Sequence, residues 1–285
     1  MRKKRTDLSE IGPWSEIKLD IIREYGAAYS SILSSQTKPR LKHVYIDAFS
    51  GAGFHATKDE GSLVLGSPTR ALFLDPPFKE YHFIDLDKGS IETLRELVHS
   101  HTTGPYDPNS VHFYNADCNR ILLTDVLPRV KYEDYRRGLC LLDPYGLDLE
   151  WQVIESAGAM QSIEIFLNFP IADMNRNVLR RDRSKVEPSQ IQRMSRYWGD
   201  DSWKEVAYSR EGNLFGWEEK TTNEAMADAF RQRLRKKAGF AYVPDPVPMR
   251  NSKKAIVYYL FFASQKPVAS KIVREIFEKY RKRAV

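Results

Sequence analysis

Acidic side chains stand at the ends of four apolar, strand-like runs of this sequence. They are Asp47, Asp85, Asp117 and Asp143, in that order along the chain. In an open α/β sheet the carboxyl ends of the parallel strands meet at one edge, and ligands bind in the crevice outside that edge. We therefore expect these carboxylates to share one rim and to bind one ligand together.

A glycine turn follows the first run. Residues 47–53 read Asp-Ala-Phe-Ser-Gly-Ala-Gly, and glycine lets the backbone approach a ligand where a Cβ atom would clash. Asp47 would hold an ammonium group directly or through water, Asp85 a ribose diol, and Asp117 or the backbone of Cys118 an adenine amino group. Together these partners describe S-adenosylmethionine (SAM). The predicted cofactor residues are Asp47, Phe49, Ser50, Gly51, Gly53, Asp85, Asp87, Asp117 and Cys118.

The same glycines also fit a relaxed dinucleotide fingerprint, which would indicate a nicotinamide or flavin cofactor. Asp47 stands against that interpretation, because a carboxylate there would repel a pyrophosphate. Asp85 lies 32 residues after Gly53, whereas the ribose-binding acid of dinucleotide folds follows the motif by about 20 residues. The sequence favours SAM, with a nicotinamide enzyme as an alternative.

The fourth run ends in Asp143-Pro144-Tyr145-Gly146, the predicted catalytic segment. Methylation of an exocyclic base amine requires acceptors for the amine hydrogens and an aromatic ring that stacks on the base. Asp143, the Pro144 carbonyl and Tyr145 would supply these groups, and a base within a duplex would have to be flipped out. The sequence has no Pro-Cys nucleophile of the kind that cytosine-C5 chemistry needs.

An alternation of strand-like and helical patterns must position these residues. It predicts a Rossmann-like α/β fold of the class I methyltransferase type, with a doubly wound, mainly parallel sheet. Residues 55–66 are expected to form a polar loop. The expected strands are 43–49, 81–85, 111–115, 139–143, 163–168 and 255–262, and the expected helices are 13–34, 67–74, 91–98, 118–128, 221–237 and the stretch after Pro267.

The alternation lapses over residues 171–250, which are polar and rich in arginine. We interpret this stretch as a mainly helical, basic insertion between an N-terminal helical segment (1–40), a SAM-binding core (41–170) and a C-terminal strand and helix (251–285) that complete the core. Basic residues with aromatic neighbours such as Trp198 and Trp203 are typical of nucleic-acid binding. The predicted nucleic-acid contacts are Arg180, Arg181, Arg231, Arg233, Lys236 and Arg250.

Composition narrows the class of protein. The 285 residues carry 44 Lys and Arg against 38 Asp and Glu, a net charge of +6 that is compatible with a polyanionic partner. The sequence contains no long apolar stretch and only two cysteines, Cys118 and Cys140. We therefore expect a cytoplasmic protein with no membrane segment, no disulfide framework and no metal site.

Several motifs resemble the three-Cys-motif partner protein (TcmP) family over nearly the whole chain. The resemblance implies a Rossmann-like methyltransferase fold and a partner similar to radical-SAM proteins of the phage Gp37/Gp68 type, which carry the three cysteines that this chain lacks. It implies little about the substrate. The motifs are Gly12-Pro13-Trp14-Ser15-Glu16-x-Lys18, residues 45–53, Gly66-Ser67-Pro68, Phe83-Ile84-Asp85, residues 142–146, Asn168-Phe169-Pro170, Trp198-Gly199-Asp200-x-Ser202-Trp203, and Met249-Arg250-Asn251-Ser252 before residues 258–264.

The tetrapeptide 143–146 is also similar to the Asp-Pro-Phe-Gly of tRNA guanine-N2 dimethyltransferases, with Tyr145 in place of Phe. Against the Asp-Pro-Pro-Tyr of amino-methylases it lacks the second proline, which leaves adenine and guanine both open. The sequence thus predicts a SAM-dependent methyltransferase that modifies an exocyclic base amine of DNA or RNA, together with a three-Cys-motif partner. The alternative is a non-catalytic partner subunit that binds SAM or nucleic acid.

Overall fold

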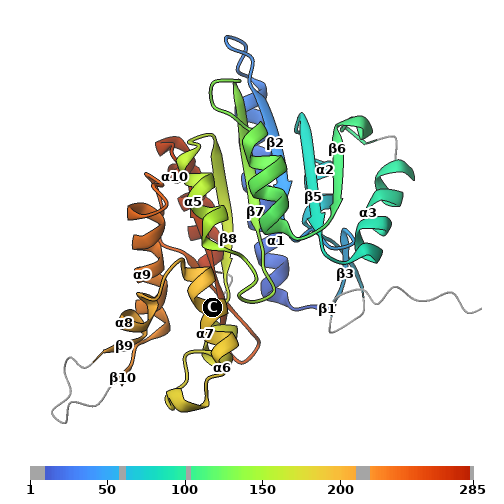
Figure 1. Ribbon diagram of the computed structural model, residues 1–285. Coiled ribbons are helices and arrows are strands. Elements are labelled where there is room, and N and C mark those ends of the chain that lie inside the picture. Colours follow the sequence, from blue (N-terminus) through green and yellow to red (C-terminus); the bar gives the residue numbers. More distant parts are fainter. Residues whose placement is uncertain (1–9, 58–61, 101–103, 210–218, 283–285) are drawn as a thin grey trace, which may run out of the picture.

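A seven-stranded sheet forms the centre of the computed structural model, which describes residues 10–57, 62–100, 104–209 and 219–282 (Figure 1). The strand order is β11-β12-β8-β7-β2-β5-β6. Five strands are mutually parallel, whereas β12 runs antiparallel to both of its neighbours. The strands are β2 (Lys42–Asp47), β5 (Glu80–Asp85), β6 (Val111–Asn115), β7 (Arg136–Leu142), β8 (Ile163–Phe169), β11 (Val247–Arg250) and β12 (Ile256–Ala263).

This topology confirms the predicted fold class. The chain enters the sheet at β2, proceeds outward to β5 and β6, and then crosses back to β7 and β8 on the other side of β2. The order reverses between β2 and β7, and in doubly wound sheets ligands bind at such a switch point, outside the carboxyl ends of the strands. These ends lie where α6, α7 and the strands β1 and β3 flank the sheet (Figure 1).

Helices cover both faces of the sheet. α1, α2, α3 and α10 share one apolar cluster, and α4, α5, α7 and α9 share the other. The π-helical turn Leu122–Val126 and the 3-10 turn Leu127–Arg129 extend α4. The helices are α1 (Pro13–Ser34), α2 (Ser67–Leu72), α3 (Lys88–Ser100), α4 (Cys118–Ile121), α5 (Trp151–Ala159), α6 (Ile171–Asn177), α7 (Pro188–Trp198), α8 (Trp203–Ala207), α9 (Asn223–Lys236) and α10 (Pro267–Arg281).

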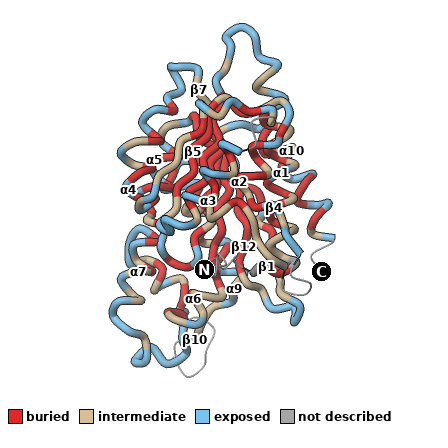
Figure 2. The backbone as a smooth tube through the Cα atoms, turned by 90° about the vertical axis from the view of Figure 1, so that its right-hand side faces the viewer, coloured by how far each residue is buried: buried red, intermediate tan, exposed pale blue. Residues whose placement is uncertain are grey.

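The strands are apolar throughout because both of their faces are covered. In β2, Val44 and Ile46 pack into the cluster beneath α4 and α5, while Tyr45 between them packs into the cluster beneath α1 and α2. Alternate side chains of the strand therefore point to opposite faces of the sheet, although the whole run is hydrophobic. Figure 2 shows buried residues concentrated along the central strands and exposed residues along the connecting loops.

The prediction of a polar loop at residues 55–66 is wrong. Strands β3 (Phe54–Thr57) and β4 (Leu63–Leu65) lie there and pair antiparallel, and β1 (Glu10–Ile11) adds to β3 in parallel. Leu63 is 62% exposed and Leu65 42% exposed, so this small sheet lacks the apolar face that makes a strand visible in a sequence.

The segment 171–250 does not stand apart from the sheet. Its last four residues form β11, which pairs with β12. Phe230 on α9 is fully buried, with its ring centroid 4.6 Å from that of Phe169 on β8 and 5.6 Å from that of Phe261 on β12. α9 therefore covers the sheet as a core helix does. The remaining pair of this segment, β9 (Tyr208–Ser209) and β10 (Glu219–Lys220), is antiparallel.

A buried carboxyl on β8 should make stability depend on pH. Glu164 accepts hydrogen bonds from Tyr25 and, at 2.9 Å, from Ser264, and burial raises its pKa to about 7. The folded state therefore retains a proton that the unfolded chain releases near its ordinary pKa, so this contribution is full below that ordinary pKa and is lost as the pH rises through about 7. Urea unfolding of wild type and Glu164→Gln between pH 5 and 8 should show that the variant loses less stability on going up this range; parallel pH dependences would contradict the assignment.

Candidate functional site

A cavity of about 780 Å³ opens at the carboxyl ends of the parallel strands. Five strand ends contribute to it, and α1, β3 and α7 supply further walls. Its volume lies within the range of ligand pockets, roughly 300–1,000 Å³. Ten of the predicted site residues line it, namely Phe49, Ser50, Gly51, Asp85, Asp87, Asp117, Cys118, Asp143, Pro144 and Tyr145.

The glycine turn after β2 forms one wall. Gly51 has a φ of +60°, and a Cβ atom added to it would have no neighbour within 4 Å, so its backbone faces open space. The buried Ser50 hydroxyl has no hydrogen-bond partner among the described residues. The turn thus brings exposed backbone at Gly51 and an unpartnered Ser50 hydroxyl to the wall of the cavity.

Asp85 is held by the same turn. Its two carboxylate oxygens accept hydrogen bonds from the backbone amides of Gly51 and Asp87, each at 2.8 Å. An ionised carboxylate accepts about four hydrogen bonds, so two acceptor positions remain for a diol. Leu86 next to it is 73% exposed and lines the cavity. Sequence analysis missed this residue, whose apolar surface suits the face of an adenine ring.

Asp87 and Asp117 begin helices. Asp87 accepts a hydrogen bond from the Ser90 amide at 2.7 Å, and Asp117 caps α4 by accepting from the Asn119 amide at 2.8 Å. Burial raises the pKa of the Cys118 thiol to about 12, which leaves it protonated and unreactive. At position 118 the group available to a ligand is therefore the backbone.

Two predicted cofactor residues do not line the cavity. Asp47 is fully buried, and burial raises its pKa to about 7, although the Ser67 hydroxyl lowers it by hydrogen bonding. One of its carboxylate oxygens has no partner among the described residues. Gly53 has a φ of +82°, and a Cβ atom there would lie 2.8 Å from Leu94 and from Thr69, so its role is to let α2 and α3 approach. Because neither Asp47 nor Gly53 lines the cavity, we assign both residues to the packing that supports the glycine turn.

Asp143 is the most strongly connected residue of the site. Its Oδ2 forms an ion pair with Lys18 of α1, and its Oδ1 accepts a hydrogen bond from the Asn168 amide nitrogen at 2.9 Å. The Asn168 side-chain oxygen is buried and has no partner among the described residues. Tyr145, two residues after Asp143, is 90% exposed at the cavity wall and is free to stack. These contacts hold the Asp143 carboxylate in place, whereas the Tyr145 ring is open to solvent.

The N-terminal helix supplies site residues that sequence analysis assigned only to packing. Trp14 and Lys18 line the cavity, and the Lys18 ammonium lies 5.7 Å from the centroid of the Tyr258 ring, which also lines it. His55 on β3 adds a ring whose pKa is lowered by burial and by the Lys18 charge. One feature of the sequence could have indicated this role, the motif Gly12-Pro13-Trp14-Ser15-Glu16-x-Lys18. A helix that only packs on the core does not require its polar residues.

The predicted nucleic-acid residues lie outside the cavity wall and differ in their surroundings. Arg233 is held by Asp200 at 2.7 Å and packs 4.7 Å from the Trp151 ring centroid, and Arg231 pairs with Asp245 at 2.5 Å. Both guanidinium groups fasten α9 to its neighbours. Arg250 donates to the Lys254 carbonyl at 2.9 Å, whereas Arg181 and Lys236 are exposed, as is Arg180, which donates to Arg176 and Lys185 carbonyls.

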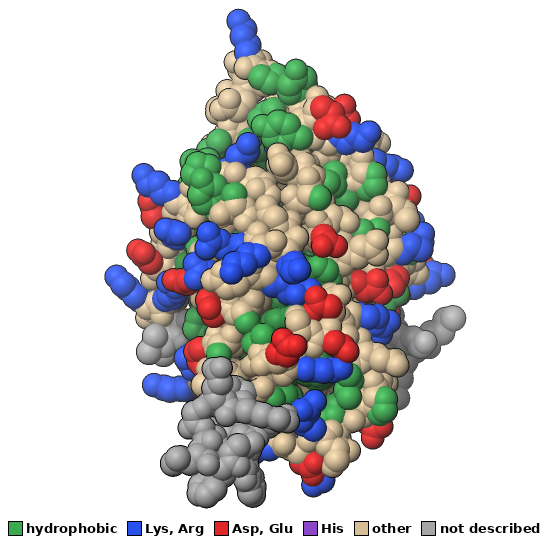
Figure 3. Space-filling view, turned by 60° about the vertical axis from the view of Figure 1, so that its left-hand side comes forward, with side chains coloured by type: hydrophobic (Ala, Val, Ile, Leu, Met, Phe, Trp, Pro, Cys, Tyr) green, Lys and Arg blue, Asp and Glu red, His purple; other side chains and the backbone are tan. Residues whose placement is uncertain are grey.

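On the face drawn in Figure 3, the basic side chains of the described residues do not form one uniform patch. Figure 3 shows Lys and Arg side chains intermixed with Asp and Glu on the face that it displays. Of the four aromatic rings expected to stack on bases, Trp198 and Trp203 are 2% and 3% exposed and belong to the core, and Phe215 and Trp217 lie outside the described residues.

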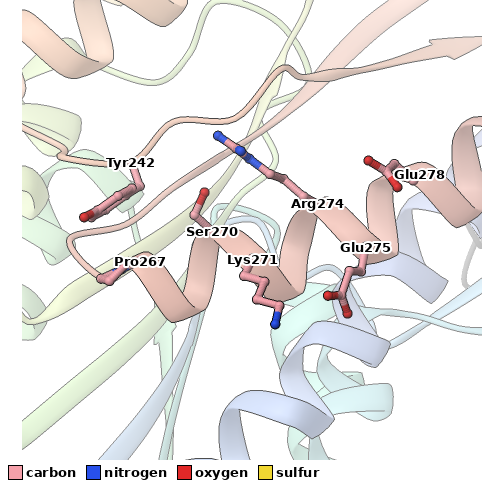
Figure 4. Close-up of a pocket in the computed structure, with 7 residues that line it drawn as sticks. All are labelled: Tyr242, Pro267, Ser270, Lys271, Arg274, Glu275 and Glu278. Atoms are coloured by element: carbon pink, nitrogen blue, oxygen red, sulfur yellow. The ribbon is translucent and has the colours of Figure 1, made fainter.

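A second depression of about 300 Å³ lies on the outer side of α10 (Figure 4). Its lining comes from α10 and from Tyr242, and its charged side chains, including Arg274 and Glu278, extend from one helix into solvent. None of the strand-end carboxylates reaches it, so the candidate site is the larger cavity. Among the residues that the structure describes, no group of three or more His, Cys, Asp or Glu side chains is arranged to hold a metal ion, and no helix is long and apolar enough to span a membrane.

No protein-family model and no curated protein sequence matches the chain. A DUF519 protein from Legionella pneumophila of known structure is 13% identical, with 92% of each chain covered and a TM-score of 0.50. A Listeria monocytogenes structure assigned as a SAM-dependent methyltransferase is 13% identical, with 87% of this chain and 99% of that chain covered and a TM-score of 0.40. The kinase-methyltransferase WbdD is 10% identical, with 92% of this chain and 44% of that chain covered and a TM-score of 0.44. The first similarity supports the fold alone, and the other two are too distant to add to it.

Proposed function

We propose that this protein is a SAM-dependent methyltransferase that modifies an exocyclic base amine of nucleic acid. The observation that carries the proposal is the cavity at the topological switch point, whose wall includes the glycine turn after β2, the Asp85 carboxylate at the end of β5 and the Asp143-Pro144-Tyr145 segment after β7. Successive strand ends thus offer a cofactor side and a substrate side within one space.

The residues present fit SAM. Open backbone at Gly51, two free acceptor positions on Asp85 and the exposed Leu86 side chain match the polar and apolar parts of a nucleoside. The lining acids Asp85, Asp87 and Asp117 favour a cofactor that carries positive charge. When bound, SAM would supply an electrophilic methyl group on a sulfonium.

The substrate amine would lie against the segment after β7. Asp143 accepts an amine hydrogen through a lone pair that Lys18 and Asn168 leave free, and the Pro144 carbonyl accepts a second. These two acceptors would orient the nitrogen lone pair toward the methyl group that a bound SAM would release from its sulfonium, leaving S-adenosylhomocysteine, and the proton that the nitrogen gives up would pass to solvent. Tyr145 stacks on the base and holds its plane.

The partner is a proposal that the sequence motifs support. We propose a three-Cys-motif protein of the Gp37/Gp68 type, because the Gly12-to-Lys18 block and the blocks at 198–203 and 249–252 resemble the TcmP family. The Gly12-to-Lys18 block contributes Trp14 and Lys18 to the cavity wall. A partner bound near α1 would therefore lie close to the reacting groups.

Calorimetry with S-adenosylhomocysteine tests the cofactor assignment. Wild type should bind it, and Asp85→Ala should weaken binding by about tenfold or more, because the carboxylate contributes charge-assisted hydrogen bonds worth about 1.5–3 kcal/mol. Asp134→Ala, at an exposed position remote from the cavity lining, is the matched control and should bind as wild type does. No heat from wild type, or protection by NAD in its place, would remove the assignment.

A further inference from the structure

The substrate side of the cavity carries a free arginine that the sequence did not single out. Arg196 of α7 lines the cavity and is exposed. Among the described residues it has no hydrogen bond and no ion pair. Arg193, one turn earlier on α7, is engaged by Asp148 at 2.8 Å and by Gln190 at 3.0 Å. Of these two neighbouring guanidinium groups, only Arg196 is available to an incoming ligand.

The acids around Arg196 do not neutralise it. Asp143 is paired with Lys18, and Asp148 is paired with Arg193. Glu150 also lines the cavity, yet no ion pair within 4.0 Å joins it to Arg196. The other charged side chains on this side of the cavity therefore form ion pairs. The exposed Arg196 guanidinium and the Glu150 carboxylate do not form one with each other. An arginine left free in this way binds phosphate with a planar, two-pronged donor set.

α7 holds Arg196 in place. The two residues after it, Tyr197 and Trp198, are buried, and the Tyr197 hydroxyl donates to the Asn168 carbonyl at 3.1 Å near the end of β8. A charged group on a fixed helix loses little entropy on binding compared with one on a loop. The helix is thus anchored beside the strand end that contacts Asp143.

Arg196 and the cofactor-binding residues belong to different ends of the cavity along the edge of the sheet. β8 and β5 are three strand spacings apart in the order β8-β7-β2-β5, about 14 Å at the usual spacing between strands. The ribose-binding position at Asp85 belongs to β5, whereas Arg196 belongs to α7, whose Tyr197 contacts the end of β8, and Tyr145 follows β7. An anion held by Arg196 therefore belongs to the substrate.

We propose that Arg196 binds a backbone phosphate next to the target nucleotide while Tyr145 stacks on its base, so that the substrate is a single-stranded or flipped-out nucleotide within a chain. This inference rests on the proposed function and assigns its substrate contacts. The proposal places the nucleic-acid contacts at the rim of the cavity and not at the basic segments 180–185 and 231–237. Phosphate contact and aromatic stacking are together typical of sequence-tolerant binding of single strands.

The test measures binding of a fluorescein-labelled 12-nucleotide single strand, as RNA and as DNA, to the full chain by anisotropy. Arg196→Gln should weaken binding about fivefold or more and reduce the slope of log affinity against log salt by about 0.7, the value for one phosphate contact on a single strand. Tyr145→Ala should weaken binding about fivefold or more. Arg274→Gln, an exposed arginine on α10 (Figure 4), is the matched control and should change neither quantity.

Calorimetry with S-adenosylhomocysteine on the same variants separates the outcomes. Arg196→Gln should keep cofactor affinity within twofold of wild type. A loss of cofactor affinity with unchanged oligonucleotide binding would overturn the proposal, because Arg196 would then bind the cofactor carboxylate. Equal behaviour of Arg196→Gln and Arg274→Gln, or no binding of either strand by wild type, would also overturn it. Oligonucleotide binding that depends on Arg196 in a protein without cofactor affinity would support this site and reject the methyltransferase.

Discussion

Asp143→Asn should lower methyl transfer by about 100-fold or more, the scale of one preorganised group that stabilises the charge developing on the amine nitrogen, while S-adenosylhomocysteine affinity stays within a few fold. The amide keeps the shape of the side chain but removes its charge and one acceptor oxygen. Because Asp143 lines the substrate side and Asp85 the cofactor side, the two variants should separate transfer from cofactor binding. The assay follows radiolabel from SAM into total RNA and DNA, with and without the proposed three-Cys-motif partner.

Folding must be kept separate from chemistry in this experiment. Lys18 is 8% exposed, and removal of the charge opposite it leaves a nearly buried ammonium uncompensated. The double variant Lys18→Met/Asp143→Asn removes both charges and should unfold at a urea concentration closer to wild type than Asp143→Asn does, yet remain inactive. Asp134→Asn is the exposed control. Full transfer by the double variant would move the chemistry elsewhere, and a wild type that transfers nothing even with its partner would favour the non-catalytic subunit.

Phe230→Ala should destabilise the protein by about 3–5 kcal/mol, the usual range for truncation of a fully buried phenylalanine. Its ring contacts five other aromatic side chains from β8, β12, α5 and α7, so the cavity left behind would lie where α9 meets the sheet. Urea unfolding gives the measurement. Val268→Ala, at a position that is 54% exposed on α10, should change stability by less than about 0.5 kcal/mol.

The same experiment tests how segment 171–250 is organised. If α9 is part of the core, wild type should unfold in one transition, and Phe230→Ala should shift the midpoint with little change in slope. Two transitions, with the variant affecting only the first, would instead indicate that segment 171–250 folds separately from the sheet.

The sequence by itself determined six of the seven strands of the central sheet and which strand ends carry carboxylates, whereas it did not reveal β11. Runs such as Tyr81–Asp85 and residues 256–263 are apolar enough to be strands whatever surrounds them, and a parallel sheet brings their carboxyl ends to one edge. Gly51 adopts a positive φ that glycine permits, Asp85 is the last residue of β5, and Asp143 directly follows β7. Each of these features depends on neighbours within a few residues, which a sequence displays.

Only the tertiary structure decided how charges pair and which side chains reach the cavity. Lys18 meets Asp143 across a sequence separation of 125 residues, and Arg233 meets Asp200 rather than a phosphate. Asp47 lies below the cavity although its sequence position matches that of Asp85 at the end of a strand. Whether a charged side chain is paired or buried depends on packing between distant segments. The residue type alone does not reveal it, because paired and exposed arginines look the same in a sequence. The free Arg196 and the bound Arg193 differ only in what the fold placed opposite them.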